Sequence, residues 1–301
     1  MPVFIPSGEP PLTKVTIIIP ARNEEKNIQN CIADISTQEF PMENLEVIVV
    51  DDYSEDNTAT LAKSTLAGSS LNGRVLKMAE TNHALSFKKG AITEAIKIAS
   101  HELIVTTDAD CRMGNKWLST IVSYYDVYHP KMIAGPTSYL QGNGLLTKLQ
   151  NLEFAGLMLA TGGGFKGQFP IMANGANLCY EKQAFEKVSG YTKSANTPSG
   201  DDLFLLMKFK DQYPDNLHFL KSPEAIVYTQ PMRTLRSIWM QRKRWASKSR
   251  QCRDLHFMTI GAIVVGTNFV FNGVLILRMV LLYKMNNFLI YSLLIIKINY
   301  L

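Results

Sequence analysis

The stretch Leu103-Ile104-Val105-Thr106-Thr107-Asp108-Ala109-Asp110 decides the fold. Its first five residues are apolar or β-branched, which predicts a buried strand. Asp108 and Asp110 follow directly, and neither carboxylate can point into a core without a partner. Because an open α/β sheet binds ligands at the C-terminal ends of its strands, we expect both to hold a hard divalent cation and a substrate diphosphate. An isolated Asp-x-Asp is otherwise a solvated turn that caps a helix, so the surrounding sequence has to decide.

An earlier apolar run ends in the same way. Residues 15–19 read VTIII and are followed by Pro20-Ala21-Arg22-Asn23-Glu24-Glu25 and a helical pattern over about residues 27–38. This order predicts a strand, a polar loop and a helix.

A second acidic pair follows another strand-like run. Residues 45–50 read LEVIVV and precede Asp51 and Asp52, after which Ser54 or Asp56 can cap a helix. Asp51 and Asp52 are not needed for that cap. Strands that each end in polar residues before a helix predict a parallel α/β sheet with a site along one edge.

Two lysines open the helix predicted over residues 86–98. In Lys88-Lys89-Gly90 the side chains lie beside free backbone N–H groups, where they can hold a phosphate or remain solvated. We place Lys89 among the donor-binding candidates. Short strands are predicted over residues 74–78 and 131–136.

A glycine-rich stretch follows a further helix. Residues 142–160 have a helical pattern, and Thr161-Gly162-Gly163-Gly164 predicts a flexible loop. The triple glycine lacks the context of a nucleotide-binding loop.

A third acidic pair opens an apolar helix. Ser199-Gly200-Asp201-Asp202 precedes a run that reads LFLLM. Acids here stabilise a helix N-terminus through its dipole, and they can also supply a general base at a pocket wall.

A basic amphipathic helix is predicted over residues 234–249. Gln241, Arg244 and Trp245 share one face, and the helix is expected to lie along a membrane surface. In one interpretation Trp239 and Trp245 anchor the helix at the membrane interface. In the other, Trp245 stacks on a sugar and Arg244 lies near a diphosphate.

The last part of the chain predicts a membrane span. Residues 257–283 contain one charge, Arg278, and the uncharged part 257–277 is long enough to cross a bilayer. A second apolar run over 288–296 is short, which suggests a truncated membrane region. The formal net charge of +5 concentrates just before the span. By the positive-inside rule these cations place the preceding residues in the cytoplasm, and without a recognition fold they do not indicate a nucleic-acid partner. They are Arg233, Arg236, Arg242, Lys243, Arg244, Lys248, Arg250 and Arg253.

Four regions follow from these patterns. Residues 1–12 form a tail, and residues 13–232 form an α/β domain with a mostly parallel mixed sheet. That domain divides into a nucleotide-binding half, 13–136, and an acceptor half, 137–232. Residues 233–254 form the basic interfacial helix and 255–301 the transmembrane region. Four cysteines without metal-site spacing fit reduced thiols in the cytosol.

Five motifs in this order resemble the family 2 glycosyltransferases, in particular the membrane branch of cellulose, chitin, hyaluronan and poly-N-acetylglucosamine synthases. The resemblance covers about residues 13–250 and the span that follows. The motifs are Pro20-Ala-Arg-Asn-Glu24, Asp51-Asp52 with Ser54, Asp56 and Thr58, Asp108-Ala-Asp110, Gly200-Asp201-Asp202 and Gln241-Arg-Lys-Arg-Trp245.

The resemblance implies a GT-A fold and inverting transfer of a sugar from a nucleoside diphosphate, by default UDP, to a hydroxyl. The acceptor is a glycan or a lipid-linked molecule of the cell envelope, and the place is the bacterial inner membrane with the catalytic domain in the cytoplasm. The roles carried over are these: Ala21, Asn23, Glu24 and Asp52 line the nucleoside site, Asp108 and Asp110 serve the diphosphate and Mg²⁺ or Mn²⁺, Asp202 is the base with Asp201 before it, and Gln241, Arg244 and Trp245 cover the donor and position the acceptor.

This chain departs from the branch at three points. Asp201 stands where the family usually has Glu, no membrane helix precedes the first strand, and one span with a fragment replaces several helices after the Gln-x-x-Arg-Trp motif. We expect either a native protein that continues past Leu301 as a processive synthase, or an enzyme that adds single sugars. A non-catalytic nucleotide-sugar-binding module is the rival from another class. A nucleotidyltransferase ranks last, because it requires a glycine-rich loop after the first strand.

Overall fold

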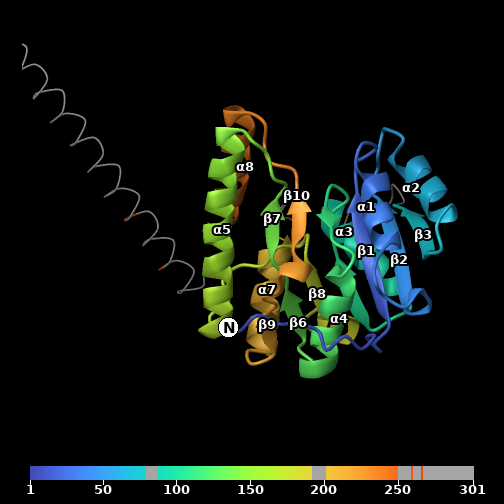
Figure 1. Cartoon of the computed structure of the whole chain (residues 1–301), viewed down its shortest axis with the longest axis horizontal. Coiled ribbons are helices and arrows are strands. Elements are labelled where there is room, and N and C mark those ends of the chain that lie inside the picture. The colour runs from blue at the N-terminus through green and yellow to red at the C-terminus, as the bar shows by residue number, and fades with distance from the viewer. Residues whose placement is uncertain (79–86, 192–200, 250–258, 260–265, 267–301) are drawn as a thin grey trace, which may run out of the picture. The chain divides into compact units, whose positions relative to one another are not determined.

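The computed structural model describes residues 1–78, 87–191, 201–249, 259 and 266 of the 301-residue chain (Figure 1). The chain divides into two compact units, Met1–Lys248 and Ser249–Leu301, and the architecture below is that of the first. Its elements in chain order are β1 (Val15–Ala21), α1 (Ile28–Ser36), η1 (Met42–Asn44), β2 (Leu45–Asp51), α2 (Thr58–Ala67), β3 (Asn72–Lys77), α3 (Phe87–Ile98), β4 (Leu103–Thr106), β5 (Arg112–Met113), α4 (Trp117–Tyr128), β6 (Met132–Ala134), β7 (Thr137–Tyr139), α5 (Leu145–Lys166), β8 (Leu178–Glu181), α6 (Lys182–Lys187), α7 (Asp201–Gln212), β9 (Leu217–Phe219), η3 (Pro223–Ala225), β10 (Val227–Thr229) and α8 (Leu235–Ser249).

The main sheet is mixed and mostly parallel, as predicted. Within the described residues its strand order is β3-β2-β1-β4-β8-β6-β9. The pairs β3–β2, β2–β1, β1–β4 and β6–β9 are parallel, and β8 runs antiparallel to both β4 and β6. In the centre, Ile18 of β1 pairs with Ile48 of β2 and Thr106 of β4. The C-terminal ends of β1, β2 and β4 therefore meet at one edge of the sheet.

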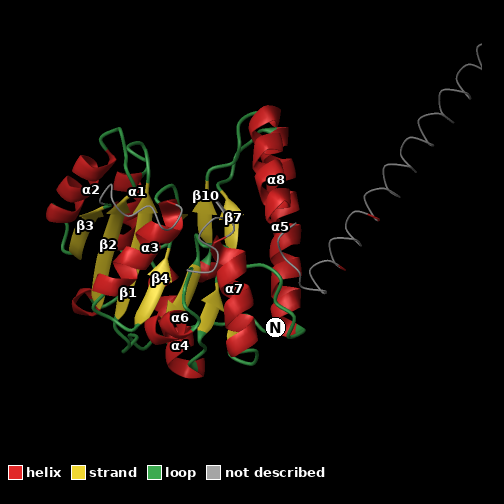
Figure 2. Cartoon of the chain, turned by 180° about the vertical axis from the view of Figure 1, so that it is seen from behind, coloured by secondary structure: helices red, strands yellow, loops and turns green. Residues whose placement is uncertain are grey.

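The central strands are continuous apolar runs because both faces of the sheet are covered. Ile17 and Ile19 pack with α1, α2 and α4 on one face, whereas Ile18 packs with α3 and α7 on the other (Figure 2). Burial on both faces explains why these strands carry no alternation of polar and apolar residues.

A small sheet and two long helices form the other side of the unit. The strand order of this sheet is β5-β10-β7. Helices α5 and α8 lie side by side beyond β7 in both views (Figures 1 and 2). Gln150 of α5 holds the segment that leads into α8, since its side chain donates to the Met232 carbonyl and accepts from the Met232 N–H, each at 3.0 Å.

The prediction of a flexible loop over residues 161–164 is wrong, because α5 continues to Lys166. A Cβ at Gly162 would lie 3.3 Å from the Phe219 ring, and one at Gly164 would lie 3.0 Å from the Phe169 carbonyl oxygen. The glycines thus allow close packing of the helix against its neighbours, and this packing outweighs their low helix propensity.

The predicted transmembrane segment lies outside the described residues, apart from Thr259 and Gly266. Among the residues that the structure does describe, no helix is both long and apolar enough to span a bilayer.

Candidate active site

The polar loops that follow β1 and β2 hold each other in place. Asn23 N–H donates to Ser54 Oγ at 3.0 Å, and Asn23 Oδ1 accepts from the Glu55 N–H at 2.9 Å. Glu24 N–H donates to Thr58 Oγ1 at 2.7 Å. Asn23 has φ 56°, a left-handed conformation that asparagine tolerates better than most residues. The Ser54 and Thr58 hydroxyls thus serve the first loop rather than a helix cap.

Two aspartates lie buried where β2 ends. Asp51 pairs with Ala21 of β1, and Asp52 N–H donates to the Ala21 carbonyl at 2.9 Å. Asp52 is 4% exposed, and burial, together with Asp51, raises its pKa against the opposing effect of Arg22. Asp51 Oδ1 and Asp52 Oδ1 have no hydrogen-bond partner among the described residues. Buried acceptors of this kind are normally satisfied, so they fit the donors of a bound polar ligand.

Asp108 and Asp110 follow β4 at the same edge. Asp108 forms an ion pair with Lys88, and Asp110 Oδ2 accepts from Thr229 Oγ1 of β10 at 3.1 Å. Burial first, and then the Asp108 charge, raise the pKa of Asp110. Burial also raises the pKa of Glu24, with Asp110 and Asp108 contributing. Three acids from two loops therefore repel one another in a partly desolvated region.

The acids fit a divalent cation that is shared with a diphosphate. Among the described residues no cluster of three or more His, Cys, Asp or Glu side chains forms a complete metal site. Mg²⁺, however, commonly binds through one or two carboxylates together with substrate phosphates. Burial first and the Asp108 charge second raise the pKa of Asp110, and a bound cation would offset both effects.

Of the two lysines at the start of α3, Lys88 reaches the acids. Lys89, the predicted donor ligand, is fully buried, with its Nζ 5.6 Å from the centre of the Phe204 ring. Neighbouring helix positions point about 100° apart, and the sequence did not reveal which one faces β4. A role for Lys89 in donor binding stays a prediction.

Asp202 and Lys88, the partner of Asp108, both approach Gly175. A Cβ built on Gly175 would be 3.7 Å from Lys88 Nζ and 3.9 Å from Asp202 Cβ. Asp202 Oδ1 also accepts from the Leu203 N–H at 2.8 Å, so the side chain supports the N-terminus of α7 as well. The side chain of Asp201 and the preceding residues 199–200 lie outside the described part.

The Gln-x-x-Arg-Trp helix packs on β7 and α5. Gln241 Oε1 accepts from the Tyr139 hydroxyl at 3.3 Å and from Arg242 Nη1 at 2.7 Å. Arg242 lies 4.4 Å above the Trp245 ring and pairs with Glu153 of α5. Gln241 and Trp245 therefore help to fasten α8, while Arg244 is exposed.

Sequence reasoning missed the residues that connect this helix to the acids. Tyr139 of β7 pairs with Thr229 of β10, and Thr229 donates to Asp110. Strands of three residues carry no periodic signal, so nothing in the sequence pointed to Tyr139 or Thr229.

Family models match most of the chain. The model described as glycosyl transferase family 2 matches residues 16–188, and the one described as glycosyl transferase family group 2 matches residues 103–301. The probable glycosyltransferase YdaM of Bacillus subtilis is 26% identical over 242 residues, which cover 78% of this chain and 55% of that protein. The beta-monoglucosyldiacylglycerol synthase of Trichormus variabilis is 25% identical over 245 residues, which cover 79% of this chain and 49% of that protein. The chain thus spans about half the length of these relatives.

Solved structures share the fold. The mannosyltransferase PcManGT from Pyrobaculum calidifontis, in complex with GDP-Man and Mn²⁺, superposes with a TM-score of 0.61 at 19% identity, covering 83% of this chain and 68% of that one. S. aureus TarS 1–349, in complex with UDP-GlcNAc, superposes with a TM-score of 0.54 at 20% identity, covering 73% and 59%. At these identities the likeness establishes a common fold.

Proposed function

The chain belongs to glycosyl transferase family 2, and from this premise we propose that it transfers a sugar from a nucleoside diphosphate sugar to a hydroxyl group of an acceptor at a membrane surface. The observation that carries the proposal is that Lys88, which forms an ion pair with Asp108, and Asp202 both approach Gly175. A diphosphate-binding acid and a candidate base come from segments almost one hundred residues apart. Their proximity is what a displacement at the anomeric carbon requires.

Asp202 acts as the general base in this reaction. Its carboxylate takes the proton from the acceptor hydroxyl as that oxygen bonds to the anomeric carbon. The bond between that carbon and the diphosphate oxygen breaks on the opposite face, so the configuration inverts and a nucleoside diphosphate leaves. A base of this kind contributes roughly 10²–10⁴-fold to the rate.

The negative charge of the leaving group has to be met at the edge of the sheet. Asp108 and Asp110 would hold Mg²⁺ or Mn²⁺, which supplies positive charge to the departing diphosphate. Lys88 already lies against Asp108 and can turn to a phosphate oxygen, and the exposed Arg244 supplies a second cation. The Mn²⁺ in the complex of PcManGT supports this metal role.

Asp51 and Asp52 provide the recognition of the donor base. Their unpartnered oxygens are acceptors for the N–H groups of a nucleobase. The solved structures of TarS 1–349 and PcManGT are in complex with UDP-GlcNAc and GDP-Man, and we take a UDP-sugar as the donor here.

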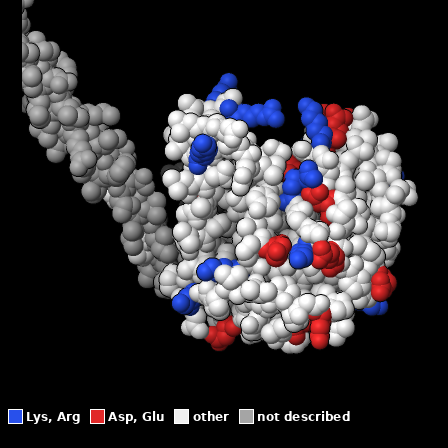
Figure 3. Space-filling model, viewed as in Figure 1, with Lys and Arg blue, Asp and Glu red and all other residues white. Residues whose placement is uncertain are grey.

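The outer face of α5 and α8 supports an acceptor at a membrane. Its apolar side chains are strongly exposed, and cations lie on the same helices while the one exposed acid of that face, Glu153, is paired with Arg242. In the view of Figure 1, where α8 lies behind α5, Figure 3 shows the region over α5 as largely uncharged with scattered basic side chains. Apolar residues interspersed with cations are typical of helices that lie on anionic lipid. The apolar residues are Leu145, Leu149, Leu152, Leu159, Leu235, Trp239 and Met240.

The predicted span at residues 257–283 and the relative named beta-monoglucosyldiacylglycerol synthase both favour a lipid or lipid-linked acceptor. The place we propose is the bacterial inner membrane, with the catalytic unit in the cytoplasm. A processive synthase stays the alternative if the native protein carries further membrane helices.

The test measures nucleoside diphosphate release by the full chain in detergent with membrane lipids, Mn²⁺ or Mg²⁺, and a panel of UDP-, GDP- and dTDP-sugars. Release from one donor, lost in Asp202→Asn but kept in Asp211→Asn at an exposed position of the same helix, is the expected result. Asp202→Asn should still bind the donor. Loss of binding as well would contradict the role of Asp202. Saturable binding without release by the wild type would favour the non-catalytic module, and pyrophosphate release would indicate a nucleotidyltransferase.

A further inference from the structure

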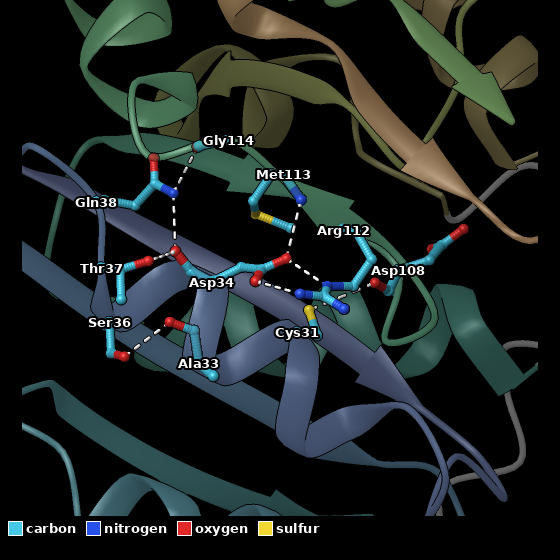
Figure 4. Close-up of polar contacts among 10 residues, drawn as sticks. All are labelled: Cys31, Ala33, Asp34, Ser36, Thr37, Gln38, Asp108, Arg112, Met113 and Gly114. Atoms are coloured by element: carbon cyan, nitrogen blue, oxygen red, sulfur yellow. Dashed lines mark hydrogen bonds and ion pairs between the residues drawn. The ribbon is translucent and has the colours of Figure 1, made fainter. Parts of the chain in front are cut away.

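Residues 108–114, which follow β4 and carry Asp108 and Asp110, are held on one side by α1 and the residues just after it (Figure 4). Asp34, near the C-terminal end of α1, accepts two hydrogen bonds from Arg112, one from Nε at 2.6 Å and one from Nη2 at 2.8 Å. It also accepts from the Met113 N–H at 3.1 Å. A bidentate guanidinium–carboxylate pair fixes direction as well as distance. Asp34 therefore sets the position of β5, which begins two residues after Asp110.

Gln38 extends this attachment along the same segment. Its amide nitrogen donates to the carbonyl groups of Asp34 and Gly114, each at 2.8 Å, and its amide oxygen accepts from the Leu118 N–H at 2.9 Å. Gln38 is 4% exposed, so these bonds are shielded from competing water. At the other end of the segment, Cys31 Sγ lies 3.7 Å from the Asp108 carbonyl oxygen.

Strand β10 contacts residues 110–113 as well. Met113 pairs with Val227, and Arg112 pairs with Tyr228. Thr229, the next residue of β10, donates to Asp110 Oδ2. The loop between β4 and β5 is thus short and fixed at both ends, so a shift of β5 has to move the Asp110 carboxylate.

We propose that Asp34 is a positioning residue of the active site, which fixes the loop of Asp108 and Asp110 through Arg112 and Met113. It has a second effect on charge. By engaging the Arg112 guanidinium, Asp34 keeps a cation two residues from Asp110 away from the carboxylates that receive the metal and diphosphate. This role rests on the proposed function. Residues that orient metal ligands without touching the metal typically change metal affinity by 10–100-fold when they are replaced.

The test compares Asp34→Asn with Glu181→Gln in the full-length protein. Each substitution removes the carboxylate charge of an ion pair. The side chains of Asp34 and its partner Arg112 are 15% and 44% exposed, and those of Glu181 and its partner Lys131 are 11% and 35% exposed. Glu181 pairs with Leu103 at the opposite end of β4 from Asp108, so it is a matched control. Binding of UDP is titrated with and without Mn²⁺ by calorimetry, and bound Mn²⁺ is counted from its electron spin resonance signal.

The expected result is a 10–100-fold weaker binding of Mn²⁺ in the presence of UDP for Asp34→Asn, with a much smaller change in binding of UDP alone. Arg112→Gln should weaken Mn²⁺ binding in the same direction but by less, because it breaks the same contact without releasing a cation near the carboxylates, and the double variant should be no worse than Asp34→Asn. Glu181→Gln should bind like the wild type. Equal binding by Asp34→Asn and Glu181→Gln would overturn the proposal.

A second variant keeps the test decisive if Asp34→Asn does not fold. Asp34→Glu retains the charge and the helix but lengthens the side chain by one methylene, so it should weaken Mn²⁺ binding several-fold, whereas Glu181→Asp should not. Wild-type affinity in Asp34→Glu would then overturn the role. A folded wild-type protein that binds none of the UDP, GDP and dTDP complexes with Mn²⁺ would overturn the proposed function itself, and with it this role of Asp34.

Discussion

The C-terminal ends of β1 and β2 and the outer face of α5 and α8 place their side chains in opposite ways. At the strand ends, polar groups are drawn inward: Asp52 is 4% exposed although it is an acid. On the outer face, apolar groups point outward: Leu152 is 72% and Leu159 78% exposed. Each arrangement lowers the stability of the isolated protein, because buried charges lose hydration and exposed leucines order water. On the proposed function, a donor completes the first surface and a lipid layer would cover the second.

The largest expected effect concerns the buried charge. Asp110→Asn should weaken Mn²⁺-dependent binding of nucleoside diphosphate by about 100-fold or more, since it removes one of two candidate ligands. Burial and Asp108 raise the pKa of Asp110 in the folded state, so its ionisation opposes folding and the wild type loses this part of its stability as the pH rises through that pKa. Asp110→Asn should accordingly have a higher Tm than the wild type at pH 7 without metal, and the difference should vanish near pH 3.

The measurements are calorimetric titration and thermal unfolding followed by circular dichroism. Asp211→Asn, at an exposed position, is the control for both. A lower Tm for Asp110→Asn than for the wild type at neutral pH would contradict the view that the ionised Asp110 carboxylate destabilises the folded protein when no metal is bound.

A second prediction uses a buried acid that serves the fold alone. Glu46 of β2 is 3% exposed, accepts from Thr16 Oγ1 at 2.7 Å and from Ser100 N–H at 2.8 Å, and pairs with Arg74. Burial raises the pKa of Glu46, but the hydrogen bonds from Ser100 and Thr16 and the Arg74 charge outweigh it, so the pKa is lowered. Glu46→Gln should reduce the free energy of unfolding by about 1–3 kcal/mol at pH 7 without changing donor binding.

Because the folded-state pKa of Glu46 is lowered, its contribution is present above the unfolded-state pKa and is lost as the pH falls through the folded-state pKa. Urea unfolding at pH 7 and at pH 3 should therefore show a gap between wild type and Glu46→Gln that narrows in acid. A change in donor affinity in Glu46→Gln would contradict the view that Glu46 serves only the stability of the fold.

A third prediction concerns the apolar face. The double substitution Leu149→Ser and Leu152→Ser should reduce turnover on a vesicle-borne acceptor by about tenfold, since two side chains no longer enter the lipid interface, and should leave donor binding unchanged. Val127→Ser, which alters a 61% exposed residue of α4, is the control. An equal loss in the control would mean that the face of α5 and α8 has no special relation to the membrane.

The smallest expected effect concerns Asn23, whose substitutions distinguish direct contact with the donor from positioning of the two loops. Asn23→Ala loses the bond to the Glu55 N–H and places alanine at φ 56°, so donor affinity should fall about three- to tenfold if the left-handed backbone costs about 1 kcal/mol. Asn23→Gly relieves the backbone but not the lost bond, and Asn23→Asp retains the acceptor. Calorimetric titration of UDP with the three variants gives the order. Full affinity in Asn23→Asp would indicate that Asn23 positions the loops, whereas a large loss there would indicate direct contact with the donor.

Long patterns in the sequence predicted the parts of the fold that depend on continuous burial. The runs at β1, β2 and β4 are strands because they are mostly apolar or β-branched, with Glu46 as the one internal acid, and the polar residues after them lie at one sheet edge because parallel strands end together. Short elements gave no such signal. Strands β5, β7 and β10 have two or three residues each. The glycines of residues 162–164 predict a break, but α5 continues through them because contacts with residues distant in sequence stabilise the helix.

The sequence by itself determined the family, the order of the motifs and which acids belong to the strand ends, because residue type and spacing carry that information. Tertiary structure decided which residues meet: Lys88 rather than Lys89 pairs with Asp108, Asp202 approaches Gly175, Thr229 reaches Asp110, and Asp34 holds Arg112. The reason is physical. A strand pattern specifies which residues are buried, but a contact between segments one hundred residues apart depends on register, helix rotation and packing, which are determined when the whole core closes.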